Sequence, residues 1–474
     1  MIKQFTLTIL AASVLSACSM APKYTRPDAP VAANYETSSA SASDAQRATD
    51  MGWRALFSDQ RLQALISTAL VNNRDLRVAA LRIEEARSLY NIQSADRLPN
   101  LNGVATGARA RTPASLTTGN SSVVSSNYQV GLSLASFELD FFGRVRSLSD
   151  AALATYLSTE EAQRSAHITL VSEVAKAYLA ERAFAEQQEL AQQTYESRAA
   201  AYALSKQRFE VGASSALDLR QDEALTQNAK VAELTLRRQR AQAMNALTLL
   251  VGQPLTDLPP AQPLSAQTIR TDLFVGMPSD LLEQRPDIRS AEQTLLAANA
   301  NIGAARAAFF PRISLTAGVG TASNELSGLF DSGSRAWSFA PQLVLPIFEG
   351  GRNIANLNLT EVRKSIAVAN YEKSIQVAFR EVADALVARD LLDEQIEAQR
   401  LATVAQEERL KFADQRFQNG ISSSLDVLDA QRELFSAQLT LVQARLLRLT
   451  NAVDLYRSLG GGLQETTVAT VPAK

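Results

Sequence analysis

Side chains suited to chemistry are scarce in this sequence, which has one cysteine, Cys18, and one histidine, His167. A lone thiol cannot form an internal disulfide or a multi-thiolate metal site. His167 lies within a long helical segment, where a single imidazole is typical of a packing or surface residue. The run Gly460-Gly461-Gly462 has no strand before it and no Lys-Ser/Thr after it, so it is not a phosphate-binding loop. We therefore expect no enzymatic activity, no metal and no cofactor.

Cys18 indicates a different chemistry, because of the residues that precede it. Lys3 gives a positive start, residues 5–15 are apolar, and Leu15-Ser16-Ala17-Cys18 resembles a bacterial lipobox. In such a motif the cysteine is acylated, with palmitate among the chains, and becomes the first residue after cleavage. Ser19 in place of Asp predicts sorting to outer-membrane lipid. The apolar run is too short to cross a bilayer core of about 30 Å, so the segment is a signal peptide and not a membrane helix. The alternative to a lipobox is a chance cysteine inside an ordinary signal peptide.

Charge and hydropathy exclude two classes of protein. Lys and Arg number 47 and Asp and Glu number 49, so no basic excess indicates a nucleic-acid partner. No long apolar run follows the signal segment. If the chain spans a membrane, it must do so with strands closed into a barrel.

The elements of the fold are expected to come from a tandem duplication. The stretch from Arg208 to Asp218 recurs from Arg416 to Asp426, 208 residues further on. Gly143-Arg144 recurs as Gly351-Arg352 at the same offset. Matches at a constant offset predict two structural repeats.

Each repeat is expected to begin with one helix, over about 59–95 and 280–308, and to continue with two strands. Ile313, Leu315, Ala317 and Val319 alternate with Ser, Thr and Gly, which is the period of a strand with one apolar face. The expected strands are 101–111, 128–141, 312–322 and 336–348, with exposed loops between the members of each pair.

Long helices are predicted after the strands. From 144 to 251 and from 353 to 459 there is no proline, and the only glycines are Gly212 and Gly420. Apolar residues of 368–396 recur at spacings of three and four, as in a coiled coil. A helix of about 65 residues is about 100 Å long. Gly212 and Gly420 predict the turns of two helical hairpins, and Ser215-x-x-Asp218 and Ser423-x-x-Asp426 predict capping boxes that start the return helices.

The chain is therefore predicted to have six parts in sequence order. They are a signal peptide (1–17), a lipidated leader (18–58), repeat 1 (59–252, with strand pair 101–141 and hairpin 144–251), a linker (253–279), repeat 2 (280–460, with strand pair 312–348 and hairpin 353–459) and a C-terminal tail (461–474).

Four strands per chain cannot close a membrane barrel, because the smallest single-chain barrels have about eight. An open sheet edge in lipid leaves backbone groups without hydrogen bonds. Three chains would supply twelve strands, so we expect a homotrimer.

These motifs, in this order and duplicated, resemble the outer-membrane factor (TolC-like) family, and within it the OprM-like lipoprotein branch. The resemblance covers essentially the whole mature chain. It implies a mixed α and β fold in which a trimeric, twelve-stranded β-barrel continues into a long periplasmic α-helical barrel. It also implies work with a periplasmic adaptor protein and an inner-membrane pump of the RND type. The motifs that carry it are the lipobox, Phe348-Glu-Gly-Gly-Arg352, Arg416-Phe-x-x-Gly420, Leu425-Asp-Val-Leu-Asp429-Ala-Gln-Arg432 and Leu459-Gly-Gly-Gly462.

The resemblance further implies a gate at the periplasmic hairpin turns. Carried over residue by residue, the closing ring includes Leu425 and Asp429, with Arg416 as the pairing partner. The equivalent places in the first repeat are held by Arg208, Leu217 and Asp218. For Asp218 and Asp426, helix capping is the alternative interpretation.

Three functions fit parts of this pattern. The first is passive conduction of drugs or other small solutes across the periplasm and outer membrane, as the exit duct of a tripartite efflux pump. The second is an exit duct for secreted proteins or peptides, built on the same architecture. The third, a periplasmic adaptor, does not fit two separate strand pairs and two equal hairpins. The lipobox and the OprM-like motifs favour efflux.

Overall fold

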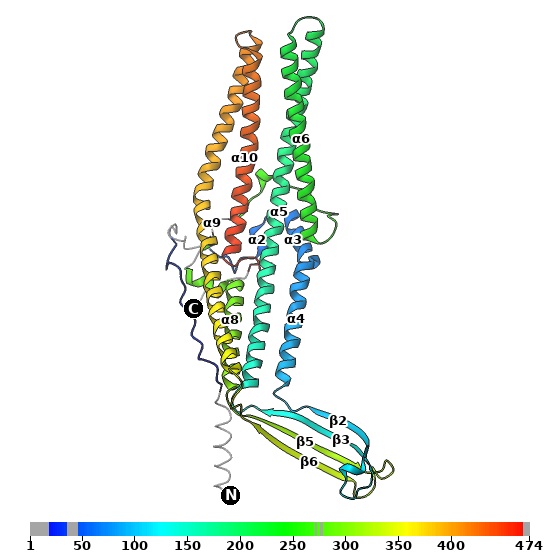
Figure 1. Cartoon of the computed structure of the whole chain (residues 1–474). Coiled ribbons are helices and arrows are strands. Elements are labelled where there is room, and N and C mark those ends of the chain that lie inside the picture. The colour runs from blue at the N-terminus through cyan, green and yellow to red at the C-terminus, as the bar shows by residue number, and fades with distance from the viewer. Residues whose placement is uncertain (1–18, 36–45, 271–272, 275–277, 468–474) are drawn as a thin grey trace. The chain divides into compact units, whose positions relative to one another are not determined.

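The computed structural model describes residues 19–35, 46–270, 273–274 and 278–467 (Figure 1). Cys18, the predicted lipid-attachment residue, lies outside these ranges. The described helices are α2 (Trp53–Leu56), α3 (Gln60–Asn72), α4 (Arg74–Ala95), α5 (Arg144–Glu210), α6 (Ala216–Val251), α7 (Leu281–Gln284), α8 (Pro286–Ala307), α9 (Arg352–Gln418) and α10 (Ser424–Ser458). The strands are β1 (Gln46–Arg47), β2 (Leu101–Thr112), β3 (Val123–Leu139), β4 (Leu273–Phe274), β5 (Arg312–Ser323) and β6 (Arg335–Val344).

The chain divides into two compact units. One combines residues up to Asp28 with 82–160 and 290–371, and the other combines 29–81, 161–289 and 372–474. The long helices α5 and α9 contribute residues to both units, because each runs for 67 residues without a proline or glycine to end it.

The first unit contains an antiparallel sheet with strand order β2-β3-β5-β6. β3 begins at Val123 rather than at 128, because it pairs with the whole of β2, from Leu101↔Leu134 to Thr112↔Val123. β6 ends at Val344 rather than at 348, just before Pro346, which has no N–H to donate to a ladder.

In the same unit the N-terminal leader lies along α8. Glu292 accepts hydrogen bonds from the hydroxyl of Tyr24 (2.9 Å) and from Nε and Nη2 of Arg26 (2.8 and 2.9 Å). Asn299 donates to the carbonyl of Pro22 at 2.7 Å. The leader therefore has defined contacts although it forms no helix or strand there.

The core of the second unit forms around a buried carboxylate. Asp59 Oδ1 accepts from the backbone N–H of Arg61 at 2.7 Å and so caps α3. Its other oxygen accepts from the hydroxyl of Tyr178 at 2.6 Å and from Nε2 of Gln267 at 2.5 Å. These bonds tie α3, α5 and the linker together, and they satisfy a carboxylate that is only 2% exposed.

The single helix expected over 59–95 is in fact two helices. The chain is extended at Asn73, whose Oδ1 accepts from the N–H of Leu76 at 2.9 Å and whose Nδ2 donates to the carbonyl of Leu250 at 2.8 Å. An asparagine that caps the next helix competes with helix continuation. A second break, at Arg285, separates α7 from α8; the Arg285 side chain binds Asp287 and Glu381 and also donates to the carbonyl of Ser458.

Within the described ranges, no helix is long and apolar enough to cross a membrane.

Candidate functional site

The two faces of the four-stranded sheet differ in chemistry. The register pairs Leu132 with Val319 and Val319 with Trp337, so these side chains lie on the same face, together with Phe339 and Leu343 of β6. We call this the apolar face. Its members are well exposed in the single chain: 56% for Leu132, 60% for Val319 and 80% for Trp337. So large an exposed apolar surface is typical of contact with lipid or another protein.

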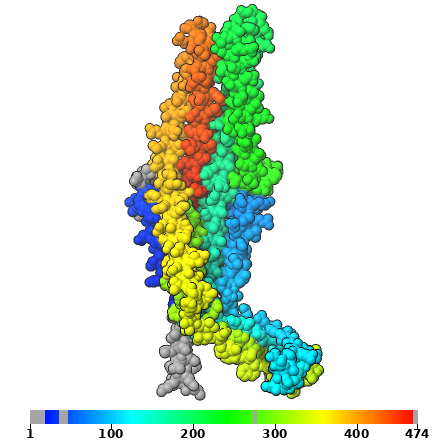
Figure 2. All heavy atoms as spheres, viewed as in Figure 1, coloured from blue at the N-terminus to red at the C-terminus, as the bar shows by residue number. Residues whose placement is uncertain are grey.

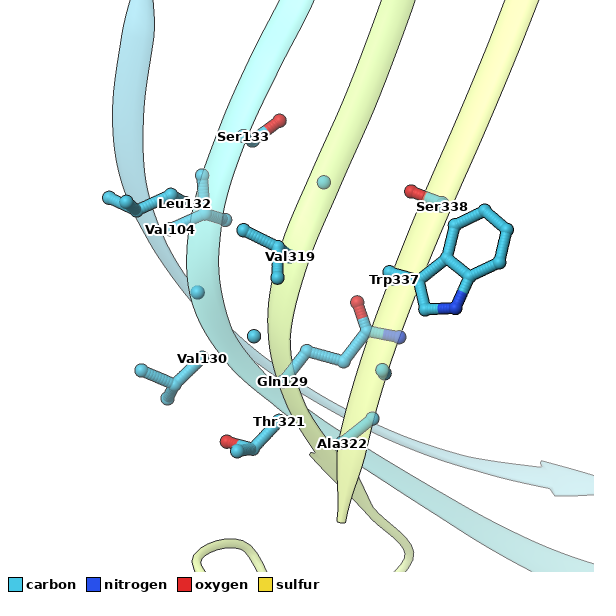
Figure 3. Close-up of a pocket in the computed structure, with 14 residues that line it drawn as sticks. Val104, Gln129, Val130, Leu132, Ser133, Val319, Thr321, Ala322, Trp337 and Ser338 are labelled. Atoms are coloured by element: carbon cyan, nitrogen blue, oxygen red, sulfur yellow. The ribbon is translucent and has the colours of Figure 1, made fainter.

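The opposite face, which we call the polar face, carries small and polar side chains: Gln129, Gly131, Ser133, Gly318, Gly320 and Ser338. A shallow hollow of about 310 Å³ is lined by residues of both faces, among them Gln129, Ser133 and Ser338 of the polar face and Leu132, Val319 and Trp337 of the apolar face (Figure 3). Gly131 and Gly320 are register partners, and a Cβ on either would overlap the backbone of the neighbouring strand. The polar face is therefore kept open by residues without bulky side chains.

A β-bulge decides the face on which Glu138 lies. The β3–β5 register shifts between Leu134 and Phe137, where Ser136 has a φ of 49°. Without the bulge, Glu138 would share the apolar face with Leu134, because residues four apart in a regular strand lie on one face. With it, Glu138 lies on the polar face.

Glu138 joins the sheet to the start of α5. It accepts from Nε and Nη2 of Arg144 at 2.8 and 2.7 Å, and from Nε of Arg312 at 2.7 Å. Arg144 is the first residue of α5 and Arg312 the first of β5. The two-pronged contact with Arg144 fixes the orientation of the guanidinium as well as its distance.

The two hairpin turns share one local geometry. Gly212 and Gly420 have φ values of 73° and 71°, in the left-handed region that glycine adopts without strain. Ala213 N–H donates to the carbonyl of Arg208 at 2.7 Å, and Ile421 N–H to that of Arg416 at 2.9 Å, which closes the last helical turn. In Figure 2 the two turns form separate tips.

Asp218 and Asp426 cap the return helices. Asp218 Oδ2 accepts from the N–H and the hydroxyl of Ser215 at 3.3 and 2.8 Å. Asp426 Oδ2 accepts from the N–H and the hydroxyl of Ser423 at 3.2 and 3.3 Å. Both carboxylates therefore have the capping role that was the alternative to a gate role. Beside the turns, Leu217 and Leu425 are 67% and 62% exposed.

Asp429 has two cationic partners within its own hairpin, and neither is the expected Arg416. Nη2 of Arg409 donates to Oδ2 at 2.6 Å, and Nη2 of Arg432 donates to Oδ1 at 2.7 Å. Within the chain Arg416 does not reach Asp429, because antiparallel helices align residues at equal distances from their turn; its pairing with Asp429 in the closing ring stays a prediction. Asp429 is nine residues from the turn glycine Gly420 and Arg416 is only four, so along the helix axis Arg416 lies about 7 Å closer to the turn than Asp429, at 1.5 Å per residue. It lies instead in a groove with Arg409, Phe412 and Asp426.

Sequence reasoning missed Arg409 and Arg432 as partners of Asp429. The i, i+3 spacing of Asp429 and Arg432 was a usable signal; the pairing with Arg409 required the hairpin register. At an offset of 208 residues, the first repeat has Ala201, Gln221 and Ala224 in place of these three residues. Only the second hairpin therefore carries this charged cluster.

Another charge approaches the cluster from α5. Arg198 is 8% exposed, and its Nε has no hydrogen-bond partner. Burial lowers the pKa of its guanidinium, and the nearby charge of Arg432 lowers it further. The charges of Arg198 and Arg432 therefore repel each other, while Arg432 donates a hydrogen bond to Asp429.

Comparison with known proteins agrees with this geometry. The sequence pattern of a family described as outer membrane efflux protein matches residues 65–253 and 277–461. The chain belongs to this family. It is 49% identical to the outer membrane protein OprJ of Pseudomonas aeruginosa over 458 residues, which cover 96% of this chain and 95% of OprJ.

Two further relatives extend the likeness. The solvent efflux pump outer membrane protein SrpC of Pseudomonas putida is 47% identical over 462 residues, covering 96% of this chain and 98% of SrpC. The open state of the Neisseria gonorrhoeae MtrE outer membrane channel superposes with a TM-score of 0.86 at 43% identity, covering 95% of this chain and all (100%) of that one.

Membership of the outer membrane efflux proteins confirms the predicted fold class and location. The fold is mixed α and β, with four strands per chain that make a twelve-stranded barrel in the trimer and continue into a helical barrel. The protein resides in the bacterial outer membrane and is the outer-membrane component of a tripartite efflux system. Because lipid-facing and lumen-facing residues alternate along the strands of such barrels, we expect the apolar face to contact lipid and the polar face to line the duct.

The remaining side chains of chemical interest lie apart from these sites. His167 is in α5, and its Nε2 is buried without a partner. Burial lowers the pKa of its imidazole. Among the described residues no group of three or more His, Cys, Asp or Glu side chains is arranged to hold a metal ion.

Proposed function

We propose that this protein conducts drugs or other small solutes passively through its duct, without catalysing a reaction. The observation that carries the proposal is the division of the sheet into a lipid-facing apolar face and a polar face of Gly, Ser and Gln. Apart from Glu138 and Arg312 at its helix end, the polar face of β3 and β5 carries small, uncharged groups that offer few strong binding contacts, which suits a wall that solutes must leave as easily as they enter.

The partners in this proposal are a periplasmic adaptor and an inner-membrane pump of the RND type. The relatives named as solvent and antibiotic efflux components support this class of system. The pump would supply the free energy of transport.

The gate in this proposal is formed by the tip of the second hairpin, with Leu425 and Asp429 on its closing ring. The bonds from Arg409 and Arg432 to Asp429 stay within one chain, so they neutralise the carboxylate without linking one chain to the next. An interaction that is equal in two states shifts no population. Exposed ion pairs contribute only about 0.2–1 kcal/mol each. Packing around Leu425 must therefore hold the closed state.

The organisation along the chain completes the proposal. A signal peptide (1–17) is removed, Cys18 is acylated, and repeats 59–252 and 280–460 are joined by the linker 253–279. The two separate stretches that match the family pattern support two repeats. The predicted places of Arg208, Leu217 and Asp218 in the ring stay part of the proposal, although Asp218 also caps α6.

A pair of cysteine variants on one strand tests the proposal. Ser133 lies on the polar face and Leu132, its neighbour, on the apolar face. In planar bilayers, a membrane-impermeant charged thiol reagent should lower the single-channel conductance of Ser133→Cys and leave Leu132→Cys unchanged. The unsubstituted protein is the control for Cys18. Equal block of both variants, or of neither, would mean that the polar face does not line the conducting path. In the same preparation, mass measurement in detergent should give three chains.

A further inference from the structure

Three arginines lie on the apolar face of the sheet, at the end of the strands that carries the loops. Gly103 pairs with Leu132, so every second residue of β2 from Gly103 onward shares the apolar face, up to Arg109 and Arg111. Arg335 opens β6 two residues before Trp337 and shares its face. A cation on a lipid-facing surface requires an explanation, since a charged side chain is costly in contact with the apolar part of the lipid.

These arginines have no acidic partner among the described residues. Arg111 donates to the hydroxyl of Ser122 at 3.1 Å, and no carboxylate oxygen lies within 4.0 Å of any of the three guanidinium groups in the described part of the chain. The opposite end of the sheet differs, because there Arg144 and Arg312 both pair with the carboxylate of Glu138. The loop end thus carries uncompensated positive charge on its lipid-facing side.

The height of the arginines places them at the level of lipid headgroups. From Leu101, at the helix end of β2, Arg109 and Arg111 are about 26–33 Å away along the strand at 3.3 Å per residue. With a strand tilt of about 35–45°, this is a rise of roughly 20–25 Å, and the apolar band of such barrels is about 25 Å tall. Since the helices extend into the periplasm, the loop end lies in the outer leaflet. The exposed Trp337 beside Arg335 is a typical residue of this boundary.

We propose that Arg109, Arg111 and Arg335 bind the phosphate groups of the outer-leaflet glycolipid, lipopolysaccharide. β2 and β6 are the two edge strands of the sheet, so barrel closure places β6 of one copy beside β2 of the next. Neighbouring strands are about 4.8 Å apart. Arg335 of one chain and Arg109 and Arg111 of the next therefore share a seam, and each trimer has three such sites. The planar, always-charged guanidinium matches a phosphate with two parallel hydrogen bonds.

Lipid binding by the purified trimer tests the site. The probe is diphosphoryl lipid A in detergent at low salt, compared with monophosphoryl lipid A and with free inorganic phosphate. The variant carries Arg109→Gln, Arg111→Gln and Arg335→Gln together. The matched control carries Arg77→Gln, Arg238→Gln and Arg380→Gln, which remove the same charge from exposed helical positions. Each arginine near an anionic lipid surface is worth about fivefold in affinity, so the triple variant should bind about 100-fold more weakly.

The expected pattern is tight binding by the unsubstituted and control trimers, weaker binding of monophosphoryl lipid A, and rescue by the Arg→Lys triple variant. Equal binding by the Arg→Gln triple variant and the control would overturn the proposal. If free inorganic phosphate bound to the trimer as tightly as lipid A, the arginines would form an anion site without lipid specificity. That result would also overturn the proposal. If the triple variant does not assemble, Arg335→Gln alone, which leaves β2 intact, should bind about fivefold more weakly. Conductance of the same trimers reports separately on the duct, so failure of lipid binding is distinguishable from failure of the proposed function.

Discussion

Removal of the charge on Glu138 should loosen the junction between the sheet and α5. The substitution Glu138→Gln keeps the shape of the side chain but removes its charge. It also replaces one acceptor oxygen with an NH₂ group, which cannot accept a hydrogen bond from a guanidinium group. Glu138 is 14% exposed, whereas its partners Arg144 and Arg312 are 30% and 56% exposed. A hydrogen bond to a charged group contributes about 1.5–3 kcal/mol when shielded, and an exposed pair about 0.2–1 kcal/mol. We therefore expect a loss of about 2–3 kcal/mol per chain, since the Arg144 contact is shielded and the Arg312 contact is exposed.

The assay is the temperature at which the trimer dissociates to monomer on a semi-native gel. Glu138→Gln should lower this temperature by several degrees, because all three junctions weaken together. Glu349→Gln is the matched control: Glu349 pairs with Arg352 one turn away at 2.7 Å, and that arginine is 75% exposed, so its loss should have little effect. Equal shifts for the two variants would refute the argument, since the arrangement of charges around Glu138 would then have no special role.

The bulge offers an independent test of the same reasoning. Deletion of Ser136 alone would remove only the extra residue and keep Glu138 on the polar face, whereas deletion of Ala135 and Ser136 together would move Glu138 to the lipid-facing side. Trimer assembly should then fall sharply. The control Ser136→Gly keeps the bulge and suits the φ of 49°, so that variant should assemble normally.

Three further outcomes are expected. Leu425→Ala should raise single-channel conductance in planar bilayers, because packing around Leu425 holds the closed state, whereas Asp429→Asn alone should change it little, because the ion pairs of Asp429 stay within one chain; a Leu425→Ala, Asp429→Asn double variant that conducts like the unsubstituted protein at the same salt would place the constriction elsewhere. Cys18→Ala should abolish labelling with radioactive palmitate, and persistent labelling would contradict the lipobox interpretation. Burial lowers the pKa of His167, so the unfolded chain binds this proton more readily than the folded one, and the stability of the fold should decrease as the pH falls below about 6.5, the ordinary value. Urea unfolding at pH 7.5 and 5 should show a smaller pH dependence for His167→Asn than for the unsubstituted protein.

Much of the fold class could be predicted from local features of the sequence. The absence of proline over 144–251 and 353–459 leaves nothing to stop a helix except Gly212 and Gly420, which reach the left-handed conformation at no steric cost. Alternation along β5 and β6 likewise separates two faces, because successive side chains of a strand point in opposite directions. These are properties of neighbouring residues, and a single sequence contains them in full.

Contacts between distant residues were decided only by the tertiary structure. The pairing of Asp429 with Arg409 depends on how α9 and α10 align, and no local pattern encodes that register. The break at Asn73 depends on the carbonyl of Leu250, far along the chain, which holds the amide in place. The face of Glu138 depends on one extra residue, whose effect appears only when β3 is paired with β5. In each case the deciding energy is a hydrogen bond or ion pair between separate elements, so the sequence supplied the groups and the packing selected the partners.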